Sequence, residues 1–406
     1  MPLITDLPCE VITSVLRKLD NIQFLLPALL ACRYFYLSYK ENPSSVVLDI
    51  LRQQIGPDLL PYAVAASEAL RLPRPRTRSS VKQLLDVLYN DPDSLVPQIQ
   101  VAPLGIVIEM GHTHDLIEGF ADAFASEAWA LFGQSERLVL SAAERFRFHR
   151  AFYRVELFLR IFRGRGSRMA GQLESEQLEL FLSRHSPWLN EQLGCVHDYL
   201  EKRFSKATLD VLSHDVEFGM LSVDYVSNGP LNHFKQLWLS QGIEFLSRAE
   251  NEKGHEGQQI FLNSAFGGSQ VGLHDALTKP YDIEIDDNRP LEDYSAEEQR
   301  ALDPREDKED VDMGPSCVWR ALHDRLPRPE WVLCHAHARL RHRAYVLWDY
   351  KRVERHQMLS SFVELRDSPG ESDDEYFKAF EEMHESFRKR SKIWLGGGRG
   401  YWDMGA

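Results

Sequence analysis

The 406-residue sequence predicts an all-α protein. Apolar residues recur at helical spacing along most of the chain, and few segments show the alternation that is typical of half-buried strands. Hydrophobic residues make up 43% and charged residues 27%, which is ordinary for a globular protein and excludes a wholly disordered chain. Pro73 and Pro75, and Gly164 and Gly166, fall between periodic segments, where they end helices.

The clearest helix is predicted at 148–162, where apolar residues at i, i+3, i+4 and i+7 from Phe148 form one stripe. Three arginines, Arg147, Arg150 and Arg154, are expected on the opposite side of this helix. The same reasoning predicts further helices at about 7–19, 22–38, 44–55, 80–90, 115–131, 174–184, 188–203, 231–249, 318–325, 331–345 and 373–393.

The acidic residues of the chain are concentrated in one segment. Residues 282–312 hold 14 acids and 4 bases, a net charge of −10, and we expect them to form a mobile loop. The expected organisation is a small module at 1–45, a large irregular helical domain at 46–281, the acidic loop at 282–315, and a helical region at 316–406 that packs back on that domain.

Charge and cysteine content restrict the possible functions. The net charge of −14 disfavours nucleic-acid binding, which relies on clustered Lys and Arg. Five well-separated cysteines without a C-x-x-C pair suit a reducing compartment, so we expect a cytoplasmic or nuclear protein. The longest strongly apolar run, 24–32, is interrupted by Pro27 and is too short to cross a bilayer. A targeting signal would contain basic residues, but the first ten residues contain no Lys or Arg.

The first 40 residues contain the most distinctive pattern. Pro8 suits the first turn of a helix, and a broad apolar face and a polar turn at Asp20-Asn21 follow before a second apolar segment. Three short helices from so few residues cannot bury all this apolar surface among themselves. Either the rest of the chain covers it, or a partner protein supplies the missing helices.

This pattern resembles the F-box, the three-helix module through which substrate receptors dock on the Skp-type adaptor of cullin-RING ubiquitin ligases. The resemblance is carried by Leu7-Pro8-x-Glu10-Val11-Ile12, Leu16, Leu19-Asp20, Leu25-Leu26 and Cys32-Arg33-x-Phe35-Tyr36. Pro27 inside the second helical segment and Gln23-Phe24 before the paired leucines depart from the F-box pattern. Segments 148–156, 187–198 and 394–402 resemble fungal F-box-like proteins without an assigned substrate.

The resemblance implies a non-catalytic adaptor without a cofactor. A Skp-type adaptor, and through it a cullin, would be its partners, and the helical body would recruit an unknown target protein for ubiquitination. The implied partner-binding and module-packing residues are Leu7, Pro8, Val11, Ile12, Leu16, Leu25, Leu29, Cys32 and Phe35. Two other functions stay open: a helical scaffold protein whose F-box-like helices belong to its own core, and a metal-dependent helical enzyme.

Histidine clusters are the only basis for the enzyme alternative. Cys334-His335-x-His337, with His342 and Cys317, lacks a zinc-ligand framework, because His335 and His337 point about 200° apart on a helix. His112-Thr113-His114-Asp115 could ligate a metal only from a strand or loop and would need further ligands, such as His197-Asp198 or His214-Asp215. We therefore predict no metal site and no catalytic residue.

Two further segments have simple interpretations. Gly396 to Gly400 follows no strand and precedes no helix, so we expect a flexible tail whose Trp394, Tyr401 and Trp402 fold back on the core. The basic cluster Arg71, Arg74, Arg76 and Arg78 is expected to be a solvated linker, or else a docking site for an acidic segment.

Overall fold

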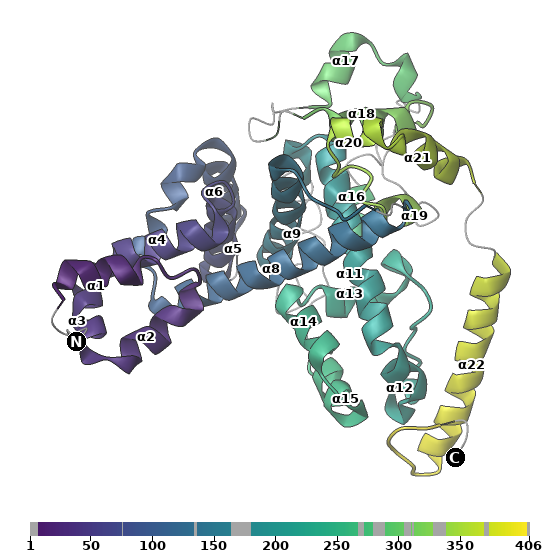
Figure 1. Cartoon of the computed structure of the whole chain (residues 1–406). Coiled ribbons are helices and arrows are strands. Elements are labelled where there is room, and N and C mark those ends of the chain that lie inside the picture. The colour runs from purple at the N-terminus through teal and green to yellow at the C-terminus, as the bar shows by residue number, and fades with distance from the viewer. Residues whose placement is uncertain are drawn as a thin grey trace. The chain divides into compact units, whose positions relative to one another are not determined.

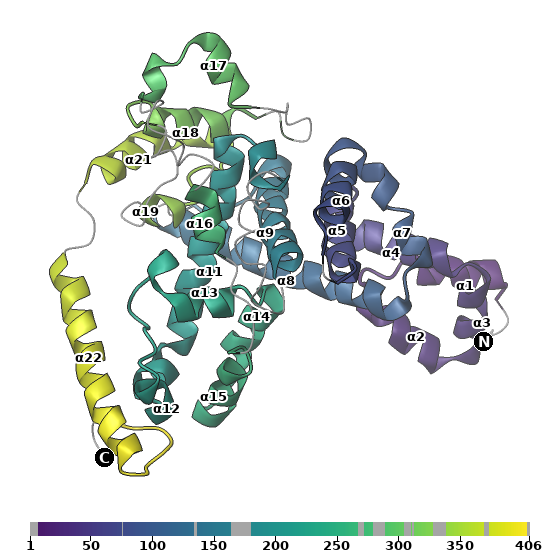
Figure 2. The ribbon, with the colours of Figure 1, turned by 180° about the vertical axis from the view of Figure 1, so that it is seen from behind.

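The computed structural model describes residues 7–74, 76–133, 136–163, 180–266, 272–278, 289–303, 310, 312–327, 338–368 and 373–403. The protein is all-α, as predicted (Figure 1; Figure 2 shows the opposite side). Extended pairing among the described residues is limited to isolated bridges, Asp215 with Tyr401 and Pro290 with Pro327. None of the helices in these ranges has the length and apolarity needed to span a membrane.

The chain divides into two compact units, Met1–Ala121 and Asp122–Ala406, and helix α8 (Leu104–Ala130) contributes residues to both. The sequence predicts a first boundary at residue 45. The structure instead joins the N-terminal helices with 46–121, because α4 (Pro43–Ile55) packs against both α3 (Arg33–Glu41) and η2 (Ile22–Phe24).

The first unit is a cluster of short helices around α4 and α5. In addition to α3, α4 and α8 it contains α1 (Cys9–Leu16), α2 (Leu25–Ala31), α5 (Leu60–Arg71), α6 (Arg78–Asn90), η3 (Pro92–Leu95) and α7 (Gln98–Val101). Helix α5 carries buried alanines on several sides, and this small side chain lets α4 and α6 pack against it. Thr77 begins α6 with a capping box to Ser80.

Two long helices form the centre of the second unit. Helix α9 (Ala142–Phe162) begins with a capping box between Ser141 and Glu144, and it packs against α11 (Pro187–His214). The prediction that α9 has one core stripe and an arginine side is wrong, because α9 is buried all round from Arg147 to Phe162, and Arg147, Arg150 and Arg154 lie inside the protein. Buried carbonyls and carboxylates compensate their charges: Arg154, for example, donates to the Leu189 carbonyl at 2.7 Å.

Shorter helices pack around this pair. They are η4 (Leu182–Arg184), α12 (Val216–Met220), η5 (Gly229–Leu231), α13 (His233–Leu239), α14 (Ile243–Asn251), α15 (His255–Asn263), α16 (Leu273–Thr278), η8 (Leu291–Asp293), α17 (Ala296–Ala301), α18 (Gly314–His323), α19 (Ala338–Arg341), α20 (Tyr350–Arg355), α21 (Met358–Asp367) and α22 (Asp373–Leu395). The predicted helix at 231–249 is two helices, because Gly242, with φ +93°, interrupts the helical backbone between α13 and α14. The predicted helix at 174–184 falls largely outside the described residues.

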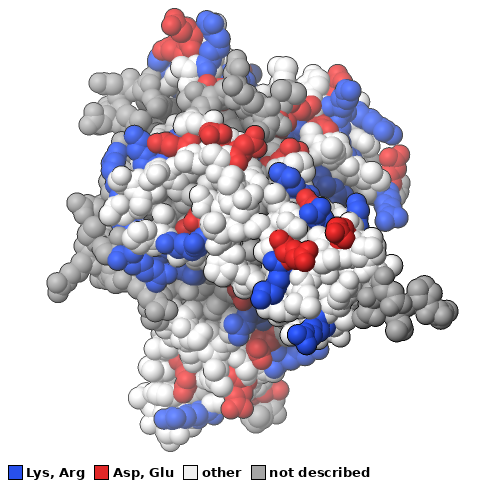
Figure 3. All heavy atoms as spheres, turned by 90° about the vertical axis from the view of Figure 1, so that its left-hand side faces the viewer, with Lys and Arg blue, Asp and Glu red and all other residues white. Residues whose placement is uncertain are grey.

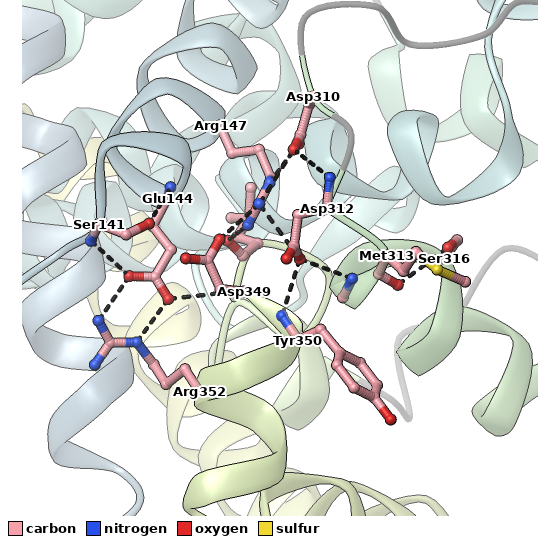
Figure 4. Close-up of polar contacts among 12 residues, drawn as sticks. Ser141, Glu144, Arg147, Asp310, Asp312, Met313, Ser316, Asp349, Tyr350 and Arg352 are labelled. Atoms are coloured by element: carbon pink, nitrogen blue, oxygen red, sulfur yellow. Dashed lines mark hydrogen bonds and ion pairs between the residues drawn. The ribbon is translucent and has the colours of Figure 1, made fainter.

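The acidic segment differs from the expected mobile loop where the structure describes it. It contains η8 and α17, and it buries Leu291 and Tyr294. Asp310 forms an ion pair with the fully buried Arg147, which also bonds the Asp349 carboxylate at 2.7 Å and the Leu347 carbonyl at 2.8 Å (Figure 4). The net charge of the segment could not predict that Leu291 and Tyr294 are buried, or that Asp310 pairs with the buried Arg147.

Candidate partner-binding surface

The first three helices form a layer whose two sides differ. Helix α3 packs against both α1 and α2. Thr13 donates to the Ser38 carbonyl at 3.3 Å, and the Tyr34 hydroxyl donates to the Leu7 carbonyl at 2.8 Å, so α1 and the residue before it are held along α3. Pro8 occupies the N-cap of α1, and Glu10 lies in its first turn, where a carboxylate interacts favourably with the helix dipole.

The structure separates the nine predicted partner-binding residues into three classes. Ile12, Leu16, Leu25 and Leu29 are buried within the chain. Leu7, Pro8 and Val11 are exposed, and Cys32 and Phe35 are partly buried. The first class can only hold the helices together, whereas the second is available to a partner.

Sequence reasoning missed several exposed apolar residues in the same region. On α1, Val15 follows Val11 by one turn and is 51% exposed. On α2, Leu26 and Leu30 form an exposed pair beside the buried pair Leu25 and Leu29, and Leu30 is 78% exposed. Phe24, Tyr36 and Leu37 are exposed as well. Helical periodicity alone could not tell which of the two α2 pairs is covered.

We call the exposed apolar set the N-terminal apolar surface. Its residues are Leu7, Pro8, Val11, Val15, Phe24, Leu26, Leu30, Tyr36 and Leu37. Of the 23 large apolar side chains exposed in the described part of the chain, eight lie within 7–37, so this region is strongly enriched. The side of the molecule on which α1, α2 and α3 lie in Figure 1 shows a broad area without charged side chains, with Lys, Arg, Asp and Glu around it (Figure 3).

Pro27 does not disturb this layer. A proline inside a helical segment kinks or restarts the helix, and α2 begins at Leu25, directly after η2. Pro27 is thus in the first turn of α2, where a helix needs no backbone N–H from it. Asn21 caps η2 by accepting a hydrogen bond from the Gln23 amide at 2.8 Å.

A polar clamp joins the layer to the rest of its unit. Asp115 on α8 accepts hydrogen bonds from Asn21 Nδ2 at 2.9 Å, Gln23 Nε2 at 2.8 Å and Gln54 Nε2 at 2.7 Å. Gln54 in turn accepts from the Ile22 amide at 3.1 Å. Gly111, one turn before Asp115, permits this approach, since an added Cβ would lie 2.2 Å from Ile22 Cγ2. The N-terminal layer is therefore attached to α4 and α8.

We expect Asp115→Ala to destabilise the first unit by about 2–3 kcal/mol, because three hydrogen bonds to an ionised acceptor are lost. Hydrogen exchange should show faster opening of 7–41 than in the unchanged protein. His112→Ala, an exposed position on the same helix, is the matched control and should change the unfolding free energy by less than about 0.5 kcal/mol. Equal effects of the two substitutions would contradict the clamp.

The histidine motif that contains Asp115 is helical. His112-Thr113-His114-Asp115 lies within α8, as does 106–108, so the strand or loop that a metal site there required is absent. His112 is exposed while His114 is buried, and burial lowers the pKa of His114. These two rings point in different directions and cannot share an ion.

Among the residues that the structure describes, one group of a histidine and two acids comes together. His197, Asp198 and Glu201 on α11 lie close enough for their ligand atoms to surround a metal ion, and all three are buried. His197 Nδ1 lies 3.1 Å from Asp198 Oδ1, and Nε2 lies 3.0 Å from Gln236 Oε1. Arg341 also donates to Asp198, at 3.3 Å. The ring nitrogens are engaged in protein hydrogen bonds, which favours a structural network.

The remaining candidates do not converge on one site. Cys334, His335 and His337 lie outside the described residues. Cys317 is on α18, and His342 lines a cavity of about 220 Å³ with Glu127, Tyr199 and Lys202. Asp215 caps α12 and bonds His255 Nε2 at 2.5 Å, while His214 bonds Ser213 and the Asp210 carbonyl.

The C-terminal tail and the basic cluster at 71–78 both form contacts within the chain. The tail folds back on the core: the Trp402 amide donates to the His214 carbonyl at 2.8 Å, and the Val216 amide donates to the Gly400 carbonyl at 2.9 Å. In the basic cluster, Arg71 pairs with Glu68, and Arg76 donates to the Ala69 carbonyl. Arg71 and Arg76 are therefore engaged by a local carboxylate and a local carbonyl.

The chain was compared with protein-family models, curated proteins and solved structures. No protein-family model, no curated protein and no solved structure matches this chain.

Proposed function

We propose that this chain is a substrate-receptor adaptor of a Skp/cullin/F-box ubiquitin ligase. Its N-terminal helices would dock on the Skp-type adaptor, and the helical body from Asp122 onward would recruit a target protein. The observation that carries the proposal is the N-terminal apolar surface, which lies on the helices whose sequence resembles an F-box. The chain would contribute binding only and no catalytic residue.

The physical support comes from the amount of exposed apolar surface. Burying a Val, Leu or Phe side chain contributes about 1.5–3 kcal/mol, so six such residues contribute on the order of 10 kcal/mol before the costs of association. Exposed apolar surface of this kind typically marks an interaction site. Because the surface consists of short helices, a partner that adds helices to the layer would complete its packing.

A second candidate function is favoured by a specific observation. The Asp115 clamp and the buried residues Ile12, Leu16, Leu25 and Leu29 make the N-terminal helices part of the core of the first unit. A helical scaffold protein would use these helices in this way. The adaptor function requires the exposed residues of the N-terminal apolar surface to bind the Skp-type adaptor. The scaffold function requires only that the buried residues pack within the first unit.

The test is a double substitution at exposed positions of α1, Val11→Asp with Val15→Asp. We expect it to weaken binding to the Skp-type adaptor by at least about 100-fold, since two charges would enter an apolar interface. The melting temperature should change little, because Val11 is 42% and Val15 51% exposed. Co-elution and calorimetry with purified adaptor would measure both effects.

Val101→Asp is the matched control, because Val101 is an exposed valine of the same unit, outside the N-terminal apolar surface. It should leave adaptor binding unchanged. Equal binding by the double variant and the control would reject docking through α1. If neither variant nor the unchanged chain binds, the scaffold function is favoured instead.

A further inference from the structure

His197 is a buried histidine whose ring faces acceptors at both nitrogens. Gln236 Nε2 donates to Glu201 Oε1 at 3.0 Å and to the Gly229 carbonyl at 3.1 Å, which fixes the orientation of the amide. Gln236 Oε1 therefore faces His197 Nε2, at 3.0 Å, and an amide oxygen can only accept. His197 Nε2 must carry a hydrogen.

The second ring nitrogen also faces an acceptor. His197 Nδ1 lies 3.1 Å from Asp198 Oδ1, and Asp198 accepts as well from Arg341, whose positive charge favours an ionised carboxylate. Hydrogen bonds at both nitrogens require both N–H groups, so the ring is a charged imidazolium. An imidazolium has no ring lone pair for a metal, which argues against metal binding by the group of His197, Asp198 and Glu201.

The surroundings of His197 explain how a charge is tolerated there. Helix α11 contributes Asp198 and Glu201, and α13 contributes Lys235, whose Nζ bonds the Ser227 carbonyl at 2.8 Å. Arg341 approaches from α19, while α9 and α16 contribute apolar side chains. Burial by itself lowers the pKa of His197, but the hydrogen bond to Asp198 and the charges of Glu201 and Asp198 outweigh burial and raise it above the usual value of 6.5.

We propose that the His197 imidazolium is a proton-dependent latch that holds α13 and the 224–232 loop against α11. Loss of its proton to solvent leaves one ring nitrogen with a lone pair directed at an acceptor, so the contact with either Gln236 or Asp198 becomes repulsive. The proton thereby couples pH to the local opening of this region. This regulatory role is independent of adaptor docking at the N-terminus.

The hydrogen-bond network shows how far such an opening would extend. Gln236 connects α13 to Glu201 and to Gly229, and the Gly229 amide also donates to Glu201 Oε1, at 2.8 Å. Asn232 donates to the Ser227 and Asp224 carbonyls, so the loop and the start of α13 form one hydrogen-bonded unit. Weakening the bond at Gln236 therefore affects the unit from 224 to 239.

The direction of the pH effect follows from linkage. A histidine with a raised pKa in the folded state stabilises the fold fully below its unfolded pKa, and this stabilisation is lost as pH rises through the folded pKa. For a single proton the opening constant increases at most tenfold per pH unit. Opening of 224–239 should therefore increase with pH from about 6.5 upward until His197 has lost its proton.

The test combines hydrogen exchange with NMR on the full chain. Exchange protection of 224–239, corrected for intrinsic rates, should fall with pH in the unchanged protein by up to tenfold per unit. In His197→Gln, the exchange protection of 224–239 should be lower than in the unchanged protein at low pH and should not depend on pH. His233→Gln, an exposed histidine on the same α13, should retain the pH dependence.

A second measurement uses the unchanged protein, so its result does not depend on whether the His197→Gln variant folds. In selectively ¹³C-labelled histidine spectra, the His197 ring should keep its imidazolium shifts at pH values where exposed histidines are already neutral. A neutral His197 at pH 6.5, or pH-independent protection of 224–239, would overturn the proposal. Stoichiometric Zn²⁺ binding that His197→Gln abolishes would likewise overturn it, because it requires a neutral ring.

Discussion

Arg341→Ala is expected to lower the unfolding free energy of the second unit by about 3–5 kcal/mol, because it leaves buried carboxylates without their cation. Arg341 donates to Glu191 through Nε at 2.5 Å and Nη2 at 3.1 Å, and to Asp198 at 3.3 Å. Gly194 leaves room for the guanidinium against α11, since an added Cβ would lie 2.7 Å from Arg341 Cζ. Chemical denaturation measures the effect.

The loss should depend on pH in a defined direction. Burial raises the pKa of Glu191 even though Arg341 opposes the shift, and without Arg341 the carboxyl should take up a proton more readily. A raised carboxyl pKa destabilises the fold above the unfolded value and not below it, so the effect of Arg341→Ala should be largest at neutral pH and smaller in acid. Lys389→Ala is the control, because its pair with Glu385 is exposed and its loss should change the unfolding free energy little. An equally small effect of Arg341→Ala would contradict the buried pair.

Arg147→Met is expected to cost about 3–5 kcal/mol and to release the acidic segment from α9. Arg147 is fully buried among Asp310, Asp349 and, at 3.5 Å, Asp312 (Figure 4). Burial by itself lowers the pKa of Arg147, but its bonds and charge interactions with Asp310 and Asp349 outweigh this and raise it, so the guanidinium stays charged. Its removal leaves these carboxylates repelling one another.

Limited proteolysis together with thermal unfolding would measure both consequences of Arg147→Met. Cleavage within 289–312 should become faster, and the melting temperature should fall. Arg145→Met is the matched control, since Arg145 lies on the same helix and pairs with Asp122 at 3.8 Å, where both side chains are exposed. Unchanged cleavage in Arg147→Met would show that the segment does not depend on this anchor.

The all-α fold could be predicted from periodicity because most helices bury one face. Helix α5 was not predicted, because buried alanines on several sides leave it without an apolar and a polar face. The environment of α9 was not predictable either. Arg154 and Arg147 donate to carbonyls 35 and 200 residues away in the sequence, those of Leu189 and Leu347.

The candidate surface was predictable in location but not in detail. The apolar pattern of 7–37 indicates short helices with excess apolar surface, and the structure contains helices there. Which side is covered depends on tertiary contacts, above all the Asp115 clamp, whose partners Asn21, Gln23 and Gln54 are 61 to 94 residues distant. Four of the nine predicted partner-binding residues are buried for this reason.

We propose that the N-terminal helices bind a Skp-type adaptor. Isothermal titration calorimetry of the intact chain against purified adaptor, with hydrogen exchange of the complex in parallel, measures this binding. We expect one-to-one binding with a Kd below about 1 μM, which corresponds to roughly 8 kcal/mol, and new protection confined to α1, α2 and α3. Absence of binding at tens of micromolar by a folded chain would contradict the claim and assign these helices to the protein's own core.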